Sequence, residues 1–293
     1  MNSPSGSRLQ AVLWILAGCF AFSLVFASGK LAGGAIPALQ IIWIRYLSGF
    51  ATVSAIAALR PGGLRPYLAS TRRLLHALRA LCGVGGGTCN VYAAMHMPLA
   101  DASALALLQG VFTVMLAVLV LRERVSLWQV FAALLCLGGA LVIVRGNSPA
   151  ADLALLLDAG AAPLVAILGA LLIACEIILI KLLSRGESML AMLLHVNGFA
   201  ALLLAVPVIL LWQSADPLTL LLLGLLGPLA IAGQMCNVRG FRLADAAWLA
   251  PFGYSSVAFS ALIGWAVFGT LPTLATLLGT ALIVGGGLVL IRR

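Results

Sequence analysis

The feature that most constrains this chain is a series of apolar segments, each about as long as a helix that crosses a lipid bilayer. A spanning helix needs about 20 predominantly apolar residues. Ten segments of this length can be placed, near residues 9–28, 37–58, 74–95, 102–121, 125–144, 162–182, 189–212, 217–238, 246–268 and 272–291. The sequence therefore predicts an integral membrane protein with ten spanning segments.

The composition excludes a soluble globular domain and favours helices over barrel strands. Only 9% of the 293 residues are charged and the mean hydropathy is +1.17, whereas soluble domains carry about 25% charged residues. Backbone polar groups in lipid must be paired internally, and barrel strands would alternate polar with apolar residues. These segments do not alternate, so we expect an all-α membrane bundle.

The first segment also has some features of a bacterial lipoprotein signal. Arg8 precedes an apolar run that leads to Leu16-Ala17-Gly18-Cys19. The residues after Cys19 continue as an apolar run, Phe20 to Phe26, where a lipoprotein would have a polar linker. We therefore expect an uncleaved first helix, with cleavage before Cys19 as the alternative.

Two halves of the sequence repeat one pattern of its rarer residues. Cys89-Asn90-Val91 followed by Asp101 is matched by Cys236-Asn237-Val238 followed by Asp245, and Gly138-Gly139 is matched by Gly285-Gly286. One three-residue insertion or deletion aligns the halves, which predicts a duplication with repeats 1–147 and 148–293. Five spans in each half would invert the second copy. Asp101 and Asp245 would then face opposite sides, each as a cap at a helix start.

The basic residues predict the orientation in the membrane. With both termini in the cytoplasm, Lys30 and Arg145 fall outside and Arg45 lies within a span, while the other Lys and Arg residues fall inside. The inside group is Arg8, Arg60, Arg65, Arg72, Arg73, Arg79, Arg122, Arg124, Lys181, Arg185, Arg239, Arg242, Arg292 and Arg293. This asymmetry favours cytoplasmic termini in an inner, or plasma, membrane. Because the charges flank apolar segments, the net charge of +9 does not indicate nucleic-acid binding.

No cofactor or metal site is indicated by the remaining motifs. The six cysteines lie within apolar segments, without Cys-x-x-Cys spacing or a His at metal-ligand spacing. The glycine tract Gly83 to Thr88 lacks the Lys-Ser/Thr of a phosphate-binding loop and follows no strand. We interpret it as a surface for close helix packing through Gly83 and Gly87.

Several short motifs, in their order and spacing, resemble the EamA-type members of the drug/metabolite transporter superfamily. They are Lys30 at the end of the first span, Pro37 with Arg45-Tyr46, Leu121-Arg122-Glu123-Arg124-Val125-Ser126, and Phe268-Gly269-Thr270. The resemblance covers essentially the whole chain and implies ten-span exporters of small metabolites, often amino acids, with a central cavity. Overall the chain looks most like the aromatic amino-acid exporters. Thr270 stands where the family often carries Glu, which favours a loop-anchoring role for Glu123 over a coupling role.

Ionisable groups within apolar spans are functional candidates because their burial costs free energy. Glu176 is the acid deepest in a span, and we weigh a titrating role against pairing with a neighbouring helix. Arg45 is expected to brace its span through carbonyls or an acid such as Asp101, and Lys30 to extend to the outer interface.

Polar and aromatic side chains on several spans are further candidates for a substrate pathway. Asn90 and Asn237 occupy matching positions, where an interhelical hydrogen bond is the alternative to pathway lining. Trp248, Phe252, Ser255 and Phe259 form one helical stripe beside Pro251, and packing is the alternative. The complete candidate set is Asn90, Tyr92, His96, Gln109, Glu176, Gln234, Asn237, Trp248, Phe252, Tyr254 and Ser255.

The sequence thus predicts a secondary transporter, not an enzyme, that exports a small metabolite by alternating access. The substrate is expected to be an amino acid, with an aromatic or apolar side chain as the finer expectation. A channel-like facilitator and a membrane-embedded lipid-modifying enzyme are the alternatives. The expected partners are a small-molecule substrate and the lipid bilayer, with no cofactor and no nucleic acid. Monomer and homodimer both remain open, as do proton exchange and facilitated diffusion.

Overall fold

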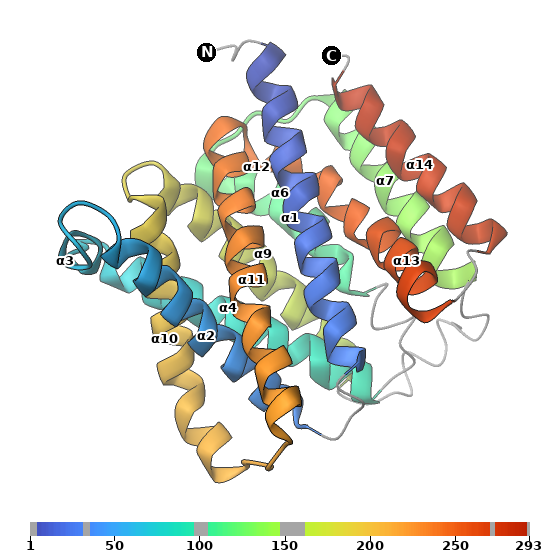
Figure 1. The fold of residues 1–293 in the computed structure, drawn as a ribbon. Coiled ribbons are helices and arrows are strands. Elements are labelled where there is room, and N and C mark those ends of the chain that lie inside the picture. The colour runs from blue at the N-terminus through green and yellow to red at the C-terminus, as the bar shows by residue number, and fades with distance from the viewer. Residues whose placement is uncertain (1–4, 32–35, 97–104, 147–161, 270–272, 292–293) are drawn as a thin grey trace.

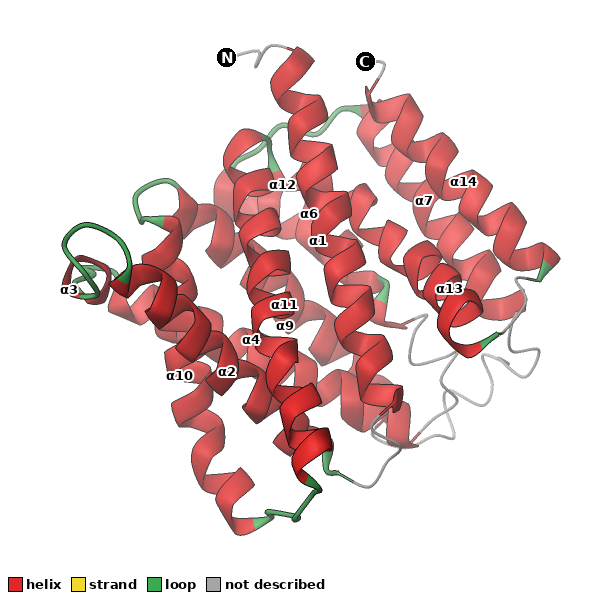
Figure 2. Cartoon of the chain, in the orientation of Figure 1, coloured by secondary structure: helices red, strands yellow, loops and turns green. Residues whose placement is uncertain are grey.

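The computed structural model describes residues 5–31, 36–96, 105–146, 162–269 and 273–291 (Figure 1). The regular structure in these ranges is helical throughout (Figure 2). The helices are α1 (Ser5–Leu31), α2 (Ala38–Ala58), α3 (Arg65–Leu68), α4 (Arg73–His96), α6 (Leu108–Leu121), α7 (Leu127–Gly146), α9 (Ala162–Ser184), α10 (Met189–Leu210), α11 (Pro217–Leu243), α12 (Ala246–Leu249), η1 (Ala250–Tyr254), α13 (Ser255–Phe268) and α14 (Leu274–Ile291).

Each apolar segment predicted from the sequence contains a helix, and the boundaries agree within a few residues where both can be compared. By length and composition, six segments of the described residues are able to cross a membrane: Arg8–Val25, Leu39–Ala58, Ala162–Ser184, Met189–Leu210, Pro217–Leu243 and Ala246–Val267. Shorter apolar helices run over Leu108–Leu121, Leu127–Val142 and Leu274–Val289. The protein is therefore an all-helical membrane protein.

The outer surface of the bundle is apolar, as a lipid environment requires. Leu119, Leu164, Leu202 and Leu210 each expose more than two-thirds of their surface. Soluble monomers rarely expose contiguous apolar patches larger than a few hundred Å². Leucines exposed on α6, α9 and α10 therefore belong against acyl chains rather than water.

Helix ends follow from local capping chemistry. The Ser188 hydroxyl accepts a hydrogen bond from the Ala191 N–H at the start of α10, and the Asp216 carboxylate accepts from the Thr219 N–H at the start of α11. Arg122 ends α6 with a positive φ of 55°, and Gly269 ends α13 with a φ of 68°. These left-handed residues turn the chain sharply and satisfy carbonyls of the last turn.

The predicted ninth span is divided at Pro251, because proline has no N–H to donate to a carbonyl of the preceding turn. The short helix α12 is followed by the 3₁₀ turn η1, and α13 continues from there. The Ser255 hydroxyl donates to the carbonyl of Phe252 at 2.7 Å, which pairs one backbone acceptor at this break.

Glycines allow three helix pairs to approach closely: α7 with α14, α4 with α9, and α1 with α11. A side chain at Gly139 would lie 2.5 Å from the carbonyl oxygen of Gly279, and one at Gly86 would lie 2.7 Å from the side chain of Ile173. Gly87 has open space around it. Packing of the glycine tract therefore goes through Gly83, Gly85 and Gly86, and the expectation for Gly87 was wrong because α9 crosses the other face of α4.

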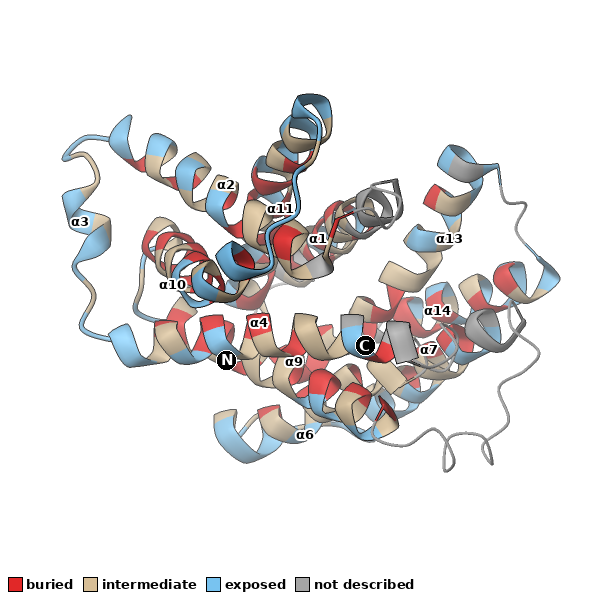
Figure 3. Cartoon of the chain, turned by 90° about the horizontal axis from the view of Figure 1, so that it is seen from below, coloured by how far each residue is buried: buried red, intermediate tan, exposed pale blue. Residues whose placement is uncertain are grey.

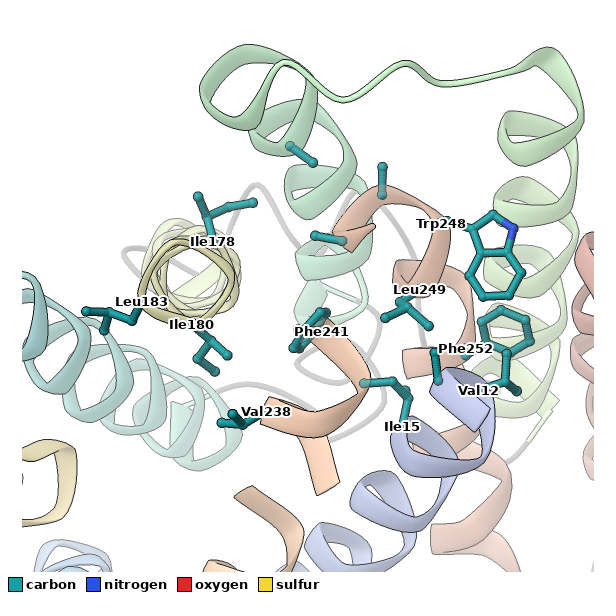
Figure 4. Packing of buried hydrophobic residues seen from close by; sticks show 14 of the residues in the cluster. Val12, Ile15, Ile178, Ile180, Leu183, Val238, Phe241, Trp248, Leu249 and Phe252 are labelled. Carbon is teal, nitrogen blue, oxygen red and sulfur yellow. The ribbon is translucent and has the colours of Figure 1, made fainter. Parts of the chain in front are cut away.

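The largest buried cluster lies toward the end of the bundle that carries both termini (Figure 1). It joins α1, α6, α7, α9, α10, α11, α12 and η1, with Ile15, Leu183, Phe241, Trp248 and Phe252 among its members (Figure 4). From the opposite end, α1 and α11 lie on one side of α9 and α6 lies on the other (Figure 3). At the end that carries the termini, side chains from both halves of the chain are packed together.

Candidate functional site between the two halves

A buried ion pair joins α4 to α9. Nε of Arg79 lies 3.7 Å from Oε1 of Glu176, and Nη1 of Arg79 donates to the carbonyl of Met192 on α10 at 3.2 Å. The Arg79 side chain is 1% exposed and that of Glu176 is 22% exposed. Gly83 makes room for the carboxylate, because a side chain there would lie 2.9 Å from Oε2 of Glu176. Of the two roles considered for Glu176, the pairing role therefore has a defined partner.

Two stacked histidines lie near this ion pair and link α4 to α10. The rings of His76 and His195 are 4.5 Å apart between centroids and inclined by 16°. Nε2 of His76 lies 3.8 Å from Oε1 of Glu187, which itself accepts a hydrogen bond of 2.6 Å from the Ser70 hydroxyl. We call Arg79, Glu176, His76, His195 and Glu187 the buried polar cluster.

A second set of polar contacts fastens α12 to its surroundings. The Glu123 carboxylate accepts hydrogen bonds from the N–H groups of Ala246 and Ala247, at 3.1 and 2.9 Å. The left-handed Arg122 positions Glu123, whose own N–H returns to the carbonyl of Ala117. Glu123 thus anchors a loop, as expected, by capping a helix of the other half of the chain.

Lys181 holds the end of α11 from α9. Its Nζ donates to the carbonyl of Phe241 at 2.8 Å and to the carbonyl of Ala244, and it lies 3.9 Å from Oδ1 of Asp245. A cation is favourable here because the last carbonyls of a helix carry partial negative charge. We call the bonds made by Glu123 and Lys181 the closing contacts.

Asp245 has a different role from the one predicted. It precedes α12, but its side chain makes no capping hydrogen bond and is 69% exposed. The Glu123 carboxylate occupies the N–H groups that Asp245 was expected to cap. The matching Asp101 lies outside the described residues, as does Thr270.

A cavity of about 610 Å³ lies beside Glu187 of the buried polar cluster and beside Lys181 of the closing contacts. It is polar, and its walls come from the end of α9, the turn before α10 and the end of α11. The lining residues are Lys181, Ser184, Arg185, Gly186, Glu187, Ser188, Phe241 and Arg242. It connects the Glu187 carboxylate to the exterior.

The two matching asparagines lie on different helix pairs rather than against each other. Asn90 faces Gly169 of α9, and a side chain at that glycine would lie 2.9 Å from Oδ1 of Asn90. Asn237 lies against Gly18 of α1 in the same manner. Each asparagine therefore occupies the same kind of position, over a glycine on a helix from the other half.

The predicted aromatic stripe is largely buried. Trp248 and Phe252 belong to the large buried cluster, each 6% exposed, with ring centroids 5.4 Å apart. Ser255 bonds locally, and Phe259 contacts Phe20 of α1 in an edge arrangement at 5.5 Å. Tyr254 is buried against Gly110 of α6. In this conformation these side chains pack the two halves together.

The remaining candidates are spread over several helices. Gln234 is buried and accepts a hydrogen bond of 3.2 Å from Asn197 of α10. Gln109 is half-buried on α6, and Tyr92 is 40% exposed on α4. The side chains of His96 and Lys30 lie outside the described part of the structure. Arg45 places its guanidinium over the ring of Tyr46, 4.1 Å from the centroid.

Most of the buried polar cluster was not predicted from the sequence. Arg79 was placed among the charges that lie between spans, although it stands inside the segment predicted over 74–95 and three residues after His76. Two ionisable groups one turn apart within an apolar span were the available signal. Their partners on α9 and α10 are about 100 residues away in sequence, which no local pattern reveals.

The chain is similar to transporters along nearly its whole length. The model of the EamA-like transporter family matches residues 9–145 and again 161–292. A riboflavin transporter of Vibrio cholerae is 30% identical, covering 94% of this chain and 91% of that protein. A pseudopaline exporter of Pseudomonas aeruginosa is 29% identical (94% and 93%), and an S-adenosylmethionine uptake transporter of Rickettsia prowazekii is 24% identical (99% and 95%).

A solved crystal structure has the same fold, with a TM-score of 0.80 at 23% identity over 98% of this chain and 96% of the other. The repeated family match, the relatives and the helical membrane architecture agree with the resemblance drawn from the motifs. The chain belongs to the EamA-like transporter family.

Proposed function

We propose that this protein is a secondary transporter that carries a small metabolite across the cytoplasmic membrane by alternating access. Family membership supports a carrier, since the similar proteins are transporters of riboflavin, pseudopaline and S-adenosylmethionine. Both termini are proposed to lie in the cytoplasm, on the side where the Lys and Arg residues between spans gather.

Among the closing contacts, the bonds made by Glu123 are the observation that carries the alternating-access proposal. Glu123 and α12 come from different halves of the chain, and their bonds sit with the large buried cluster toward one end of the bundle. Such bonds are able to exchange for water when the halves separate. The described conformation is then the one closed at the end that carries the termini.

We also propose that residues 1–147 and 148–293 are inverted repeats around the pathway. The double family match supports this division. So do the equivalent placements of Asn90 over Gly169 and Asn237 over Gly18. Carriers are commonly built from inverted repeats with the substrate site between them.

For the substrate, we propose export of an amino acid with an apolar or aromatic side chain. The similar proteins include an exporter and an uptake transporter. The outward direction of transport is therefore part of the proposal. Of the pathway candidates, the partly exposed Asn90, Tyr92 and Glu176 are proposed to meet substrate in this conformation, and the buried Trp248 and Phe252 when the halves separate.

A flux assay on purified protein in liposomes tests this function. The substrate panel contains aromatic and aliphatic amino acids, riboflavin and S-adenosylmethionine, each measured by counterflow. We expect saturable counterflow of at least one amino acid. Trp248→Ala should abolish it while the protein stays inserted, and the matched change Trp265→Ala, on a side chain that is 48% exposed, should keep it. No counterflow with any compound, or single-channel currents, would contradict the carrier proposal.

A further inference from the structure

Among the residues that the structure describes, neither ring nitrogen of His76 has a hydrogen-bond partner, although the side chain is 0% exposed. Buried polar groups in folded proteins are nearly always hydrogen-bonded, and an unpartnered one calls for a functional or energetic reason. A neutral imidazole carries one N–H donor and one bare acceptor nitrogen. The nearest counter-group is the Glu187 carboxylate, 3.8 Å from Nε2 and beyond hydrogen-bonding distance.

The stacked partner His195 has a defined proton arrangement. Its Nδ1 lies 2.8 Å from the carbonyl oxygen of Ala191, one turn earlier on α10. A carbonyl only accepts, so Nδ1 of His195 carries the proton and Nε2 is the bare nitrogen. Neutral His195 therefore has room for one more proton, at Nε2.

Two rings this close do not both become charged easily. Like charges at a separation of 4.5 Å repel strongly in a site shielded from water. The charged groups around His76 are Glu187 from the turn before α10, His195 from α10 and Arg79 one turn along α4. Arg79 in turn is paired with Glu176 of α9. Glu187 is thus the anion left to balance one added proton.

From these contacts we propose that His76, His195 and Glu187 form a binding site for a single proton, which links α4 of the first half to the turn before α10 of the second. The proton enters through the cavity of about 610 Å³ that Glu187 lines. The Glu187 carboxylate, which lies between the cavity and the buried ring, passes the proton to Nε2 of His76, which then donates a hydrogen bond to Oε1 of Glu187. Loss of the proton returns the unpartnered arrangement of the described structure.

If the protein transports a substrate as proposed, substrate movement is coupled to the binding of this proton. This consequence rests on the proposed function. The bond between His76 and Glu187 forms with the proton and breaks with its release, at the joint between the two halves. Glu176 is less suited to this role because Arg79 already neutralises it.

Titration of the imidazoles by NMR tests the site without any substrate. The protein has three histidines, so ¹⁵N-histidine labelling in nanodiscs gives few signals, and His76→Gln and His195→Phe assign them. We expect the pair together to take up one proton and no second one as the pH is lowered, because two charged rings would repel each other. Glu187→Gln should make protonation require a lower pH, whereas Asp216→Asn, a matched change at an exposed helix cap, should leave the titration unchanged. Two independent protonations, or none, would overturn the site.

Flux at varied pH tests the coupling. We expect His76→Gln and Glu187→Gln to remove the pH dependence of net transport while counterflow at equal pH persists. Glu176→Gln should retain the pH response of its remaining flux. Loss of that response in Glu176→Gln with its retention in His76→Gln would overturn the coupling role. If the wild type shows no counterflow, the proposed function fails, and the NMR titration still decides whether the proton site exists.

Discussion

Glu123 supplies the acceptors for two backbone N–H groups at the start of α12. Because a helix start leaves several N–H groups unpaired, an anionic acceptor there stabilises both the helix and its attachment. Glu123→Ala should therefore lower the free energy of unfolding by about 1–2 kcal/mol, measured by reversible unfolding in mixed micelles. Asp245→Asn is the matched control and should change it by less than about 0.5 kcal/mol, since the Asp245 side chain is 69% exposed and makes no capping hydrogen bond. A larger effect for Asp245 would restore that residue as the cap.

Arg79 and Glu176 should show energetic coupling in a double-mutant cycle. Arg79→Met leaves a partly buried carboxylate without its counterion, which typically costs about 3–5 kcal/mol. Adding Glu176→Met should cost less than its single-variant effect, giving a coupling of at least about 1 kcal/mol in the same unfolding measurement. Strict additivity of the two changes would show that the ion pair contributes nothing.

At the scale of helices, the α7–α14 pair depends on contact between backbones. Gly139→Ala would place a methyl group 2.5 Å from the carbonyl oxygen of Gly279, and such overpacking costs about 1–3 kcal/mol. Gly138→Ala meets open space and should stabilise the helix by up to about 1 kcal/mol. Thermal denaturation should move in opposite directions for these neighbouring variants. Equal shifts would mean that the pair is not packed closely.

The helices themselves were predictable, because an apolar run of bilayer length specifies a helix without reference to any other part of the chain. The division of the ninth span at Pro251 has an equally local cause, since proline has no N–H. The contacts between helices were less accessible. That Glu123 rather than Asp245 caps α12, and that Gly86 rather than Gly87 meets α9, depends on which faces turn toward each other. Those orientations are set by residues far apart in sequence.

For the whole molecule, the inverted-repeat proposal makes a prediction about sidedness. Reporter fusions after Asp101 and after Asp245 should report opposite sides of the membrane, with Asp245 in the cytoplasm. A fusion after Arg293 should agree with the one after Asp245. The same side for both aspartates would contradict the inversion, while a uniform reversal of all three would contradict only the orientation.

The Arg79 ion pair also has a consequence for how the protein is made. Arg79 belongs to α4, but its partners, Glu176 and the Met192 carbonyl, are synthesised about 100 residues later. During membrane insertion, the Arg79 guanidinium of α4 is therefore unpaired in or near the bilayer until α9 and α10 are made. An unpaired charge there costs free energy. The final placement of α4 must await the arrival of α9 and α10. The newly made first half is thus a folding intermediate that cannot complete its packing alone. Its lifetime in the membrane is set by the rate at which the second half is synthesised and inserted.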